Sequence, residues 1–220
     1  MPDLAVILPA AGASSRYGKD KLNERLGSAS VLEHSLRAFL DQIQVKSIII
    51  VGRCSVPVRD SRIHCVEGGD CRAQSVWNGV RAVSSDLEWV AIHDAARPLV
   101  SQKLIAETFA AAQQYGAAAP ALPVHLTIKH AGASLPSQVI RTVPRHDLFA
   151  LQTPQIARRE DLLEAFEKCP IPLTQVTDDL QLLELIGKPT WLVPGDDRNL
   201  KITTRLDFQL AQLLMQDSIG

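Results

Sequence analysis

The stretch LAVILPAAGASSR, residues 4–16, decides the architecture that we predict for this chain. Its first five residues are apolar without interruption, which is typical of a strand buried on both faces in a parallel sheet. The small residues after Pro9 then form a loop at the carboxyl end of that strand, where ligands bind in α/β proteins. Gly12 lets backbone N–H groups approach a phosphate, and Arg16 and Lys21 add positive charge. We therefore predict a nucleoside triphosphate site here.

Two common phosphate loops do not fit this stretch. The dinucleotide fingerprint G-x-G-x-x-G is absent because Ser14 occupies the place of the second glycine. A Walker A loop fails because five residues separate Gly12 from Gly18 and Asp20 follows Lys19. By itself the stretch also fits an ordinary connection between a strand and a helix, with its charges in solvent.

Composition limits the classes of protein that the chain can belong to. With 220 residues, 46% hydrophobic and 21% charged, it is an ordinary globular chain, which we interpret as one domain over residues 1–220. The net charge of -1 gives no general attraction to nucleic acid or to an anionic membrane. Any anion site must therefore come from a local group of Arg and Lys.

The cysteines and the absence of apolar spans indicate a cytoplasmic protein. Cys54, Cys65, Cys71 and Cys169 have no C-x-x-C spacing, so we expect reduced thiols and no structural zinc. The beginning of the chain does not resemble a signal peptide, and no apolar run approaches the ~20 residues that span a bilayer.

The segments after the loop alternate between helices and strands. Ser30 and Glu33 form a capping box for a helix that we expect to reach about Ile43. Residues 46–51, which contain the apolar run Ile48–Val51, and the shorter segment 63–66 predict two further strands. Strand, helix, strand is the βαβ unit of a parallel sheet.

A second glycine turn, residues 67–79, opens a helix that we expect to end near Val83. Arg72 and Ser75 lie one helical turn apart, and the helix N-terminus adds partial positive charge. The turn is therefore a second candidate ligand contact. A plain helix cap with Arg72 in solvent is almost as plausible on this segment alone.

Residues 89–98, WVAIHDAARP, bring a carboxylate to the end of an apolar strand. Magnesium needs only one or two protein carboxylates beside substrate phosphates, so Asp94 is our candidate ligand and Arg97 a candidate anion contact. Asp94 as a simple turn residue is the alternative. We interpret His93 as a packed core residue without a chemical role.

The second half of the chain keeps the α/β pattern apart from one excursion. We predict a helix from Ser101 to a left-handed cap at Gly116, and a strand over 117–122. Alternating apolar residues and a turn-rich centre then predict a β-hairpin arm at about 123–145. A lone hairpin is marginal in water, so we expect it to pack on a second subunit of a homodimer.

The remaining elements return to the main body. We expect helices over 159–169 and 177–187, a strand over 190–193 and a last helix from Thr204. In that last helix the expected buried face contains Leu206, Leu210, Leu213 and Leu214.

These segments together resemble the cytidylyltransferases that join CTP to 2-C-methyl-D-erythritol 4-phosphate. The resemblance covers nearly the whole chain and rests on the order of eight motifs: P-A-A-G-x-x-x-R, V-L-E-H-S, G-G-x-x-R-x-x-S-V, H-D-A-A-R-P, T-I-K, Q-T-P-Q, T-D-D and N-x-K-I-T. It implies a Rossmann-like fold with a mixed, mainly parallel sheet flanked by helices. It also implies a Mg²⁺ requirement and a homodimer whose β-arms complete each other's sites.

The resemblance also implies roles for individual residues. Arg16, Lys21, Arg72 and Asp94 match catalytic positions, with Asp94 as the metal ligand. The positions that match CTP contacts are Ala10, Ala11, Gly12, Gly69, Asp70 and Ser75. The positions that match contacts to the sugar phosphate are Arg97, Thr127, Arg145, Thr177 and Lys201, of which Thr127 and Arg145 enter the neighbouring subunit's site.

Three positions depart from the family pattern. Ser14 replaces a glycine, Asp20 a proline, and Leu126 an acidic residue of the arm. The loop is also short, which makes Lys19 a second candidate for the role of Lys21.

Two other functions fit the same residues. A cytidylyltransferase for ribitol 5-phosphate has similar loops, although the Ala95-Ala96 pair favours methylerythritol phosphate. The departures at Leu126 and in the loop also fit a nucleotide-binding protein without catalytic activity.

Overall fold

The centre of the molecule is β1 (Leu4–Pro9), the strand on which the sequence prediction was built. A computed structural model describes residues 2–12, 17–18, 20–52, 56 and 58–216. β1 lies between β4 (Val45–Val51) and β6 (Trp89–Ile92) and is parallel to both. Its first five residues are fully buried, as expected for a strand covered on both faces.

The main sheet has eight strands and is mixed but mainly parallel, which confirms the predicted fold class. Its order is β10-β7-β11-β6-β1-β4-β5, with β12 paired to β7. The remaining strands of this sheet are β5 (Ile63–Val66), β7 (Ala117–Pro123), β10 (Phe149–Leu151), β11 (Gln155–Arg158) and β12 (Trp191–Pro194). β11 runs antiparallel between β6 and β7, and the sequence analysis missed it because it holds only four residues after a Pro.

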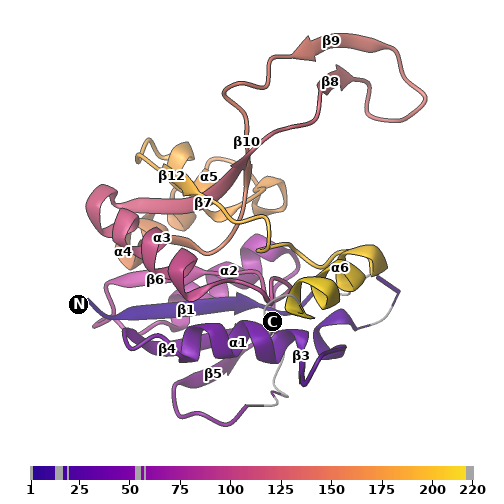
Figure 1. Cartoon of the computed structure of the whole chain (residues 1–220). Helices are drawn as coiled ribbons and strands as arrows, with labels where there is room; N and C mark the ends of the chain where they lie inside the picture. The colour runs from indigo at the N-terminus through magenta and orange to yellow at the C-terminus, as the bar shows by residue number, and fades with distance from the viewer. Residues whose placement is uncertain (1, 13–16, 19, 53–55, 57, 217–220) are drawn as a thin grey trace.

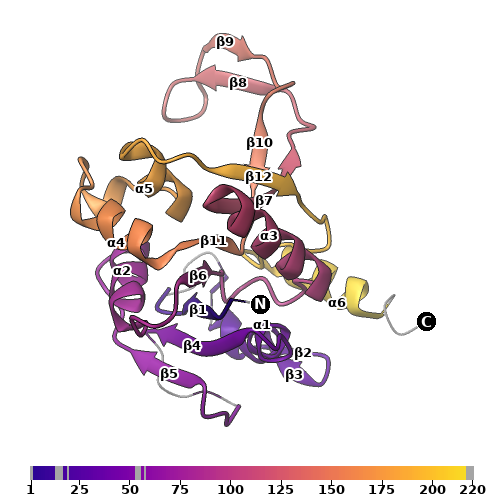
Figure 2. The same cartoon turned by 90° about the vertical axis from the view of Figure 1, so that its left-hand side faces the viewer.

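Helices cover both faces of this sheet (Figures 1 and 2). One face packs against α1 (Val31–Leu40), α3 (Gln102–Tyr115) and α6 (Arg205–Gln216). The other packs against α2 (Arg72–Ala82), α4 (Arg159–Glu167) and α5 (Asp179–Leu185). A Cβ added at Gly79 would lie 2.6 Å from Ile7, so this glycine allows α2 to approach β1 closely.

Most predicted helix ends are confirmed. Ser30 accepts a hydrogen bond from the Glu33 amide at 3.2 Å, which is one half of the predicted capping box. The other half does not form, because the Glu33 carboxylate pairs with Arg37 instead. α1 also ends at Leu40, earlier than predicted. Gly116 caps α3 with a positive φ of 94°, as expected.

The predicted hairpin arm lies outside the main sheet. β8 (Ile128–Ala131) and β9 (Val139–Val143) pair only with each other, and they project from the ends of β7 and β10 (Figure 1). Short elements elsewhere are the β2–β3 hairpin (Arg25–Leu26 and Ala29–Ser30) and the single turns η1 (Lys21–Asn23) and η2 (Leu173–Gln175).

The predicted buried face of the last helix is wrong. Leu206, Leu210 and Leu213 are 72%, 47% and 59% exposed, whereas Phe208 and Ala211 face the core. Both rows have helical spacing, so periodicity alone could not choose between them. The larger Phe208 decides the orientation, because its ring meets the edge of Tyr17 at 6.2 Å between centroids.

Candidate active site

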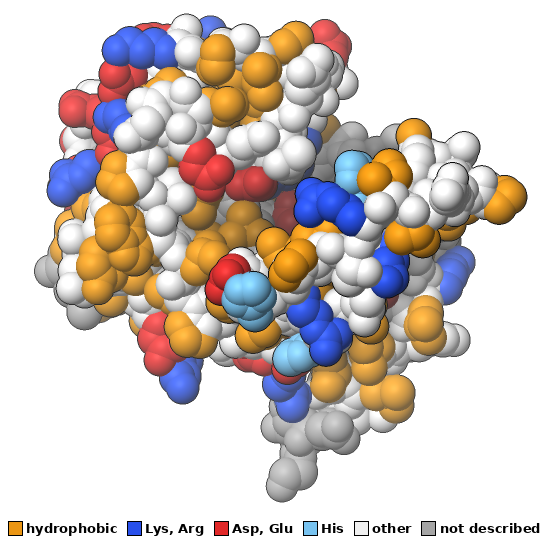
Figure 3. Space-filling model, turned by 90° about the horizontal axis from the view of Figure 1, so that it is seen from above, with side chains coloured by type: hydrophobic (Ala, Val, Ile, Leu, Met, Phe, Trp, Pro, Cys, Tyr) orange, Lys and Arg blue, Asp and Glu red, His pale blue; other side chains and the backbone are white. Residues whose placement is uncertain are grey.

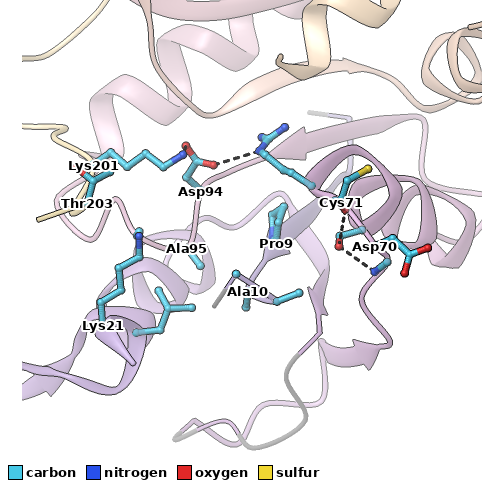
Figure 4. A pocket seen from close by; sticks show the side chains of 16 residues that line it. Pro9, Ala10, Lys21, Asp70, Cys71, Asp94, Ala95, Lys201 and Thr203 are labelled. Carbon is cyan, nitrogen blue, oxygen red and sulfur yellow. Dashed lines mark hydrogen bonds and ion pairs between the residues drawn. The ribbon is translucent and has the colours of Figure 1, made fainter. Parts of the chain in front are cut away.

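A cavity of about 520 Å³ opens at the carboxyl ends of β1 and β6 (Figure 4). Segments from four distant parts of the sequence meet there: the first glycine loop, the second glycine turn, the loop after β6 and the segment before α6. The lining residues are Pro9, Ala10, Ala11, Gly12, Lys21, Leu22, Gly69, Asp70, Cys71, Arg72, Ser75, Asp94, Ala95, Ala96, Lys201 and Thr203.

Two glycines hold the first loop in place. A Cβ added at Gly52 would lie 2.3 Å from the Ala11 Cβ, and one added at Gly68 would lie 2.8 Å from it. The Ala11 methyl group thus occupies space that only glycine leaves free. The Ala10 amide donates to the Val51 carbonyl at 2.8 Å, so it is already engaged within the sheet. Ala11 and Gly12, which follow it, line the cavity.

The second glycine turn is braced internally. The Gly69 amide donates to the Ser75 hydroxyl at 3.0 Å, and that hydroxyl donates to the Cys71 carbonyl at 3.1 Å. Ser75 is only 2% exposed. Its hydroxyl therefore fixes the shape of the turn at the start of α2, and Asp70 extends from the turn as an exposed carboxylate.

Asp94 is the electrostatic centre of the cavity. Its carboxylate lies 2.9 Å from the Lys201 ammonium and 3.5 Å from the Nε atoms of both Arg72 and Arg97. Burial alone would raise the pKa of Asp94, but the three cations outweigh burial and hold that pKa well below its usual range. Asp94 is therefore a carboxylate anion that orients three cationic side chains.

Arg72 is fixed by a second buried carboxylate. Both of its terminal nitrogens donate to Asp179 at the start of α5, at 2.9 and 2.8 Å. Burial opposes the charge of Arg72, yet Asp179 and Asp94 more than offset it and raise the pKa of Arg72 above its usual value. The alternative that placed Arg72 in solvent is wrong, because its guanidinium bridges two carboxylates.

Lys21 enters the cavity on a capped turn. Asp20 accepts a hydrogen bond from the Leu22 amide at 3.2 Å and another from the Asn23 side chain at 2.9 Å, so it caps η1. The aspartate that departs from the family pattern thus shapes the turn that carries Lys21.

The start of α6 anchors the segment before Lys21. The Arg205 guanidinium lies 4.8 Å from the ring centroid of Tyr17 and pairs with Glu24 at 3.2 Å. Burial, together with Glu24, raises the pKa of Tyr17 to about 12. The start of α6 therefore holds the residues on either side of Lys21.

The surroundings of Asp94 do not fit a preformed metal site. Both of its oxygens face cations, and a Mg²⁺ ion bound at about 2.1 Å would meet those like charges. Within the described part of the chain, no group of three or more His, Cys, Asp or Glu side chains converges on one point. Asp70, the other carboxylate of the lining, is exposed and pairs with no described cation.

The structure brings most of the predicted site residues together. Ten of them line the cavity: Ala10, Ala11, Gly12, Lys21, Gly69, Asp70, Arg72, Ser75, Asp94 and Lys201. Arg97 lies behind Asp94 with a side chain only 11% exposed. Thr177 precedes α5 and bonds to Asp178 and Gln181, away from the cavity lining. Arg16 and Lys19 lie outside the described residues.

Thr127 and Arg145 are on the arm and do not reach the cavity of their own chain. The Arg145 guanidinium donates to the backbone carbonyl of His125, within the arm itself. A contribution of these residues to a site therefore needs another copy of the chain.

Sequence reasoning missed several residues that shape the site. Asp179 is the clearest case, although the T-D-D motif marked its position. Gln155 accepts hydrogen bonds from the Asp179 and Leu180 amides at 2.8 and 3.0 Å and so fixes the start of α5. No local pattern announces either contact, because the partners are far apart in sequence.

The comparisons with known proteins agree with the motif order. A family model described as IspD, 2-C-methyl-D-erythritol 4-phosphate cytidylyltransferase, matches residues 4–217. The chain belongs to this family. A member of the same name from Caldanaerobacter subterraneus subsp. tengcongensis is 37% identical over 228 residues, covering 97% of this chain and 99% of that protein.

Two solved structures of family members share the fold. The enzyme of the same name from Thermus thermophilus has a TM-score of 0.82 and 33% identity, covering 97% of this chain and 99% of that one. The one from Francisella tularensis has a TM-score of 0.85 and 28% identity, covering 96% and 99%. Among the described residues, no helix of this family member is long and apolar enough to cross a bilayer.

Proposed function

We propose that this chain transfers CMP from CTP to 2-C-methyl-D-erythritol 4-phosphate and releases pyrophosphate. The observation that carries the proposal is the match to the family along residues 4–217, together with a cavity that places the family's motifs around one carboxylate. The relatives described above carry the methylerythritol name, which favours this substrate over ribitol 5-phosphate.

In the reaction, an oxygen of the sugar phosphate attacks the α-phosphorus of CTP, and the bond from that phosphorus to the leaving pyrophosphate breaks. Two anions must meet in line, so positioning and neutralisation of charge contribute most of the catalysis. Little acid or base assistance is needed, and none of the cysteines takes part.

The chain's own groups divide this task between them. Ala11 and Gly12 line the cavity and would offer their amides to phosphate oxygens, and Lys21 would add positive charge from η1. Lys201 remains 37% exposed while it pairs with Asp94, so its ammonium can also contact the incoming sugar phosphate. Asp94 holds Lys201 and Arg72 in orientation, and Arg16 is predicted to join them.

We propose Mg²⁺ as the cofactor, bound chiefly by the triphosphate. Magnesium commonly takes its ligands from substrate phosphates and waters, with one or two carboxylates, and Asp70 is the exposed carboxylate of the cavity lining. When bound, the ion would neutralise negative charge on the triphosphate. Isothermal titration with MgCl₂ should give no heat of binding to the protein alone, and a saturable heat once CTP is present. Equally tight binding without CTP would contradict this arrangement.

We also propose that the arm forms a homodimer and completes the partner's site. Between residues 123 and 145 there are three Lys or Arg and no acidic residue, which suits a surface that meets anionic substrates. The arm also exposes large apolar side chains: Leu126 is 77% exposed, Leu135 86% and Ile140 65%. Figure 3 looks down on this end of the molecule, where hydrophobic and basic side chains lie side by side.

We also propose a cytoplasmic location for this protein.

Pyrophosphate release tests the proposed reaction. Purified protein with CTP and Mg²⁺ should release pyrophosphate with methylerythritol phosphate and do so more slowly with ribitol 5-phosphate. Equal or faster release with ribitol phosphate would overturn the choice of substrate. Binding of CTP without any release would instead support the catalytically silent alternative.

A further inference from the structure

Asp94 and Arg97 sit on one short turn after β6, and this turn is closed at both ends. The Arg97 amide donates to the Asp94 carbonyl at 2.9 Å within the turn. The residue before it, His93, is fully buried, and its amide donates to the Ile7 carbonyl on β1 at 2.9 Å. The position of two charged side chains therefore depends on what holds this turn.

The contacts of the His93 ring define its tautomer. Nε2 lies 3.1 Å from the Arg97 carbonyl oxygen, which can only accept, so Nε2 must carry the hydrogen. Nδ1 is then an acceptor and lies 3.0 Å from the Thr153 hydroxyl. That hydroxyl donates to Nδ1 and accepts from the Asp94 amide at 3.1 Å. One neutral tautomer thus satisfies every group in the chain of hydrogen bonds.

A second buried residue, Asn199, closes this series of hydrogen bonds into a ring. The side-chain amide of Asn199 donates to the Thr153 carbonyl at 2.8 Å. The backbone carbonyl of Asn199 accepts from the Arg97 guanidinium at 2.7 Å. Asn199 is 0% exposed and stands two residues before Lys201. The ring of hydrogen bonds therefore links the turn of Asp94 to the segment that delivers Lys201.

We propose that His93 is a positioning residue, whose neutral Nε2–H tautomer fixes Asp94 and Arg97 for the transfer reaction. The proposal rests on the proposed function. His93 itself touches no cavity space and acts through the turn that follows it.

The competing interpretation is that His93 only fills space. Its ring packs edge-on against Phe39 at 4.9 Å between centroids, as an apolar ring also would. The two interpretations differ in one respect: a packing role needs only the ring's volume, whereas a positioning role needs the donor at Nε2 and the acceptor at Nδ1.

Nitrogen-15 NMR of the ligand-free protein tests the tautomer without any turnover. Spectra of histidine-labelled protein at pH 7 should show His93 as a neutral ring protonated at Nε2. Comparison with His93→Gln assigns the signal. A ring protonated at Nδ1, or a charged imidazolium, would overturn the proposal, whether or not the protein proves to be a cytidylyltransferase.

Steady-state kinetics test the positioning role. His93→Phe keeps the volume and loses both hydrogen bonds, so kcat should fall by about 10²-fold, while KM for CTP changes less than about twofold. His93→Gln keeps a donor near Nε2 and should recover part of the loss. Thr153→Val should behave like His93→Phe, and Thr153→Ser like the unmodified protein. The exposed His64→Gln is the control and should change nothing.

A double-mutant cycle decides the outcome if single variants are unstable. Because His93 and Thr153 act through the same series of hydrogen bonds, the double variant His93→Phe/Thr153→Val should be no slower than the slower single variant. Unchanged kcat in a folded His93→Phe, or multiplication of the two losses, would contradict the proposal. Absence of turnover in the unmodified protein would contradict the proposed function and leave the NMR test standing.

Discussion

The cavity and the arm differ in how far contacts within one chain pair or bury their side chains. At the cavity, the buried Asp94 pairs with Arg72, Arg97 and Lys201, and the buried Asp179 holds Arg72 from the start of α5. On the arm, Leu135 and Ile140 are 86% and 65% exposed, and two strands pair only with each other. The comparison teaches that folding of one chain pairs the charges of the cavity, whereas it leaves large apolar side chains of the arm exposed, which fits the proposed contact with a second copy of the chain.

The largest effect should come from breaking the charged centre. Asp94→Ala leaves Lys201, Arg72 and Arg97 facing one another, so we expect pyrophosphate release to fall at least about 10³-fold and unfolding free energy to fall by about 3–5 kcal/mol. Urea unfolding and a pyrophosphate assay measure the two effects. Asp94→Asn keeps the shape and is the matched variant. Activity close to that of the unmodified protein in Asp94→Ala would remove the carboxylate from the mechanism.

Acid should lower the free energy of unfolding through His93, which is buried beside the cavity. Its pKa is about 4 in the folded protein and 6.5 in the reference state, so the unfolded chain binds the proton first as pH falls. Stability is therefore full above pH 6.5 and decreases towards pH 4, by about 3 kcal/mol in total. Asp94 and Arg97, which flank the ring, have opposite effects on this pKa.

Urea unfolding between pH 7 and pH 4 measures that loss. In His93→Gln the slope over this range should be smaller by the histidine's share, whereas the exposed His64→Gln should keep the full slope. An unchanged slope in His93→Gln would show that another group dominates acid sensitivity.

Complementation between two inactive variants should test whether the arm acts in the site of a second chain. Arg145→Ala should reduce turnover by about 10²-fold, with the fold of the main body intact. When Arg145→Ala and Asp94→Ala chains are mixed and allowed to exchange, each mixed dimer would hold one site with both residues present. Activity should then return to about a quarter of the unmodified level. No recovery in samples shown by native mass spectrometry to contain mixed dimers would mean that each arm serves its own chain.

The smallest effect should come from the outer face of α6. Leu210 is 47% exposed, so Leu210→Gln should change the unfolding free energy by no more than about 0.5 kcal/mol. Phe208→Ala on the opposite side should cost about 3–5 kcal/mol. Thermal unfolding of the two variants compares the faces directly, and a large loss for Leu210→Gln would mean that this face is covered in solution.

Much of the fold could be read from local patterns. The apolar runs at 4–8 and 48–51 predicted neighbouring parallel strands, because strands buried on both faces lose their polar alternation. Ser30 and Gly116 marked helix ends through hydrogen bonding and a positive φ, both local properties. β11 and the facing of α6 could not be read, since each depends on which neighbours the sheet and the loop supply.

The candidate site divides along the same line. Motifs placed Asp94, Arg72 and Lys201 at strand and helix ends, so their approach to one edge of the sheet followed from the α/β order. The sequence did not define which groups these side chains contact. Arg72 was predicted to meet a ligand or solvent, and it bridges Asp94 and Asp179. Magnesium at Asp94 was predicted from a carboxylate at a strand end and from the family resemblance, and neither of these reveals the three cations around that carboxylate.

By itself, the sequence determined the class of fold, the family and the set of polar residues at the sheet edge, because these follow from periodicity, from turn residues and from motif order along the chain. Only the tertiary structure decided which charges pair, which tautomer His93 adopts and which side of α6 is buried. The physical reason is distance along the chain: Asp179 lies 107 residues from Arg72, and Thr153 lies 60 from His93. Such contacts are set by packing in three dimensions, for which no local pattern carries a signal.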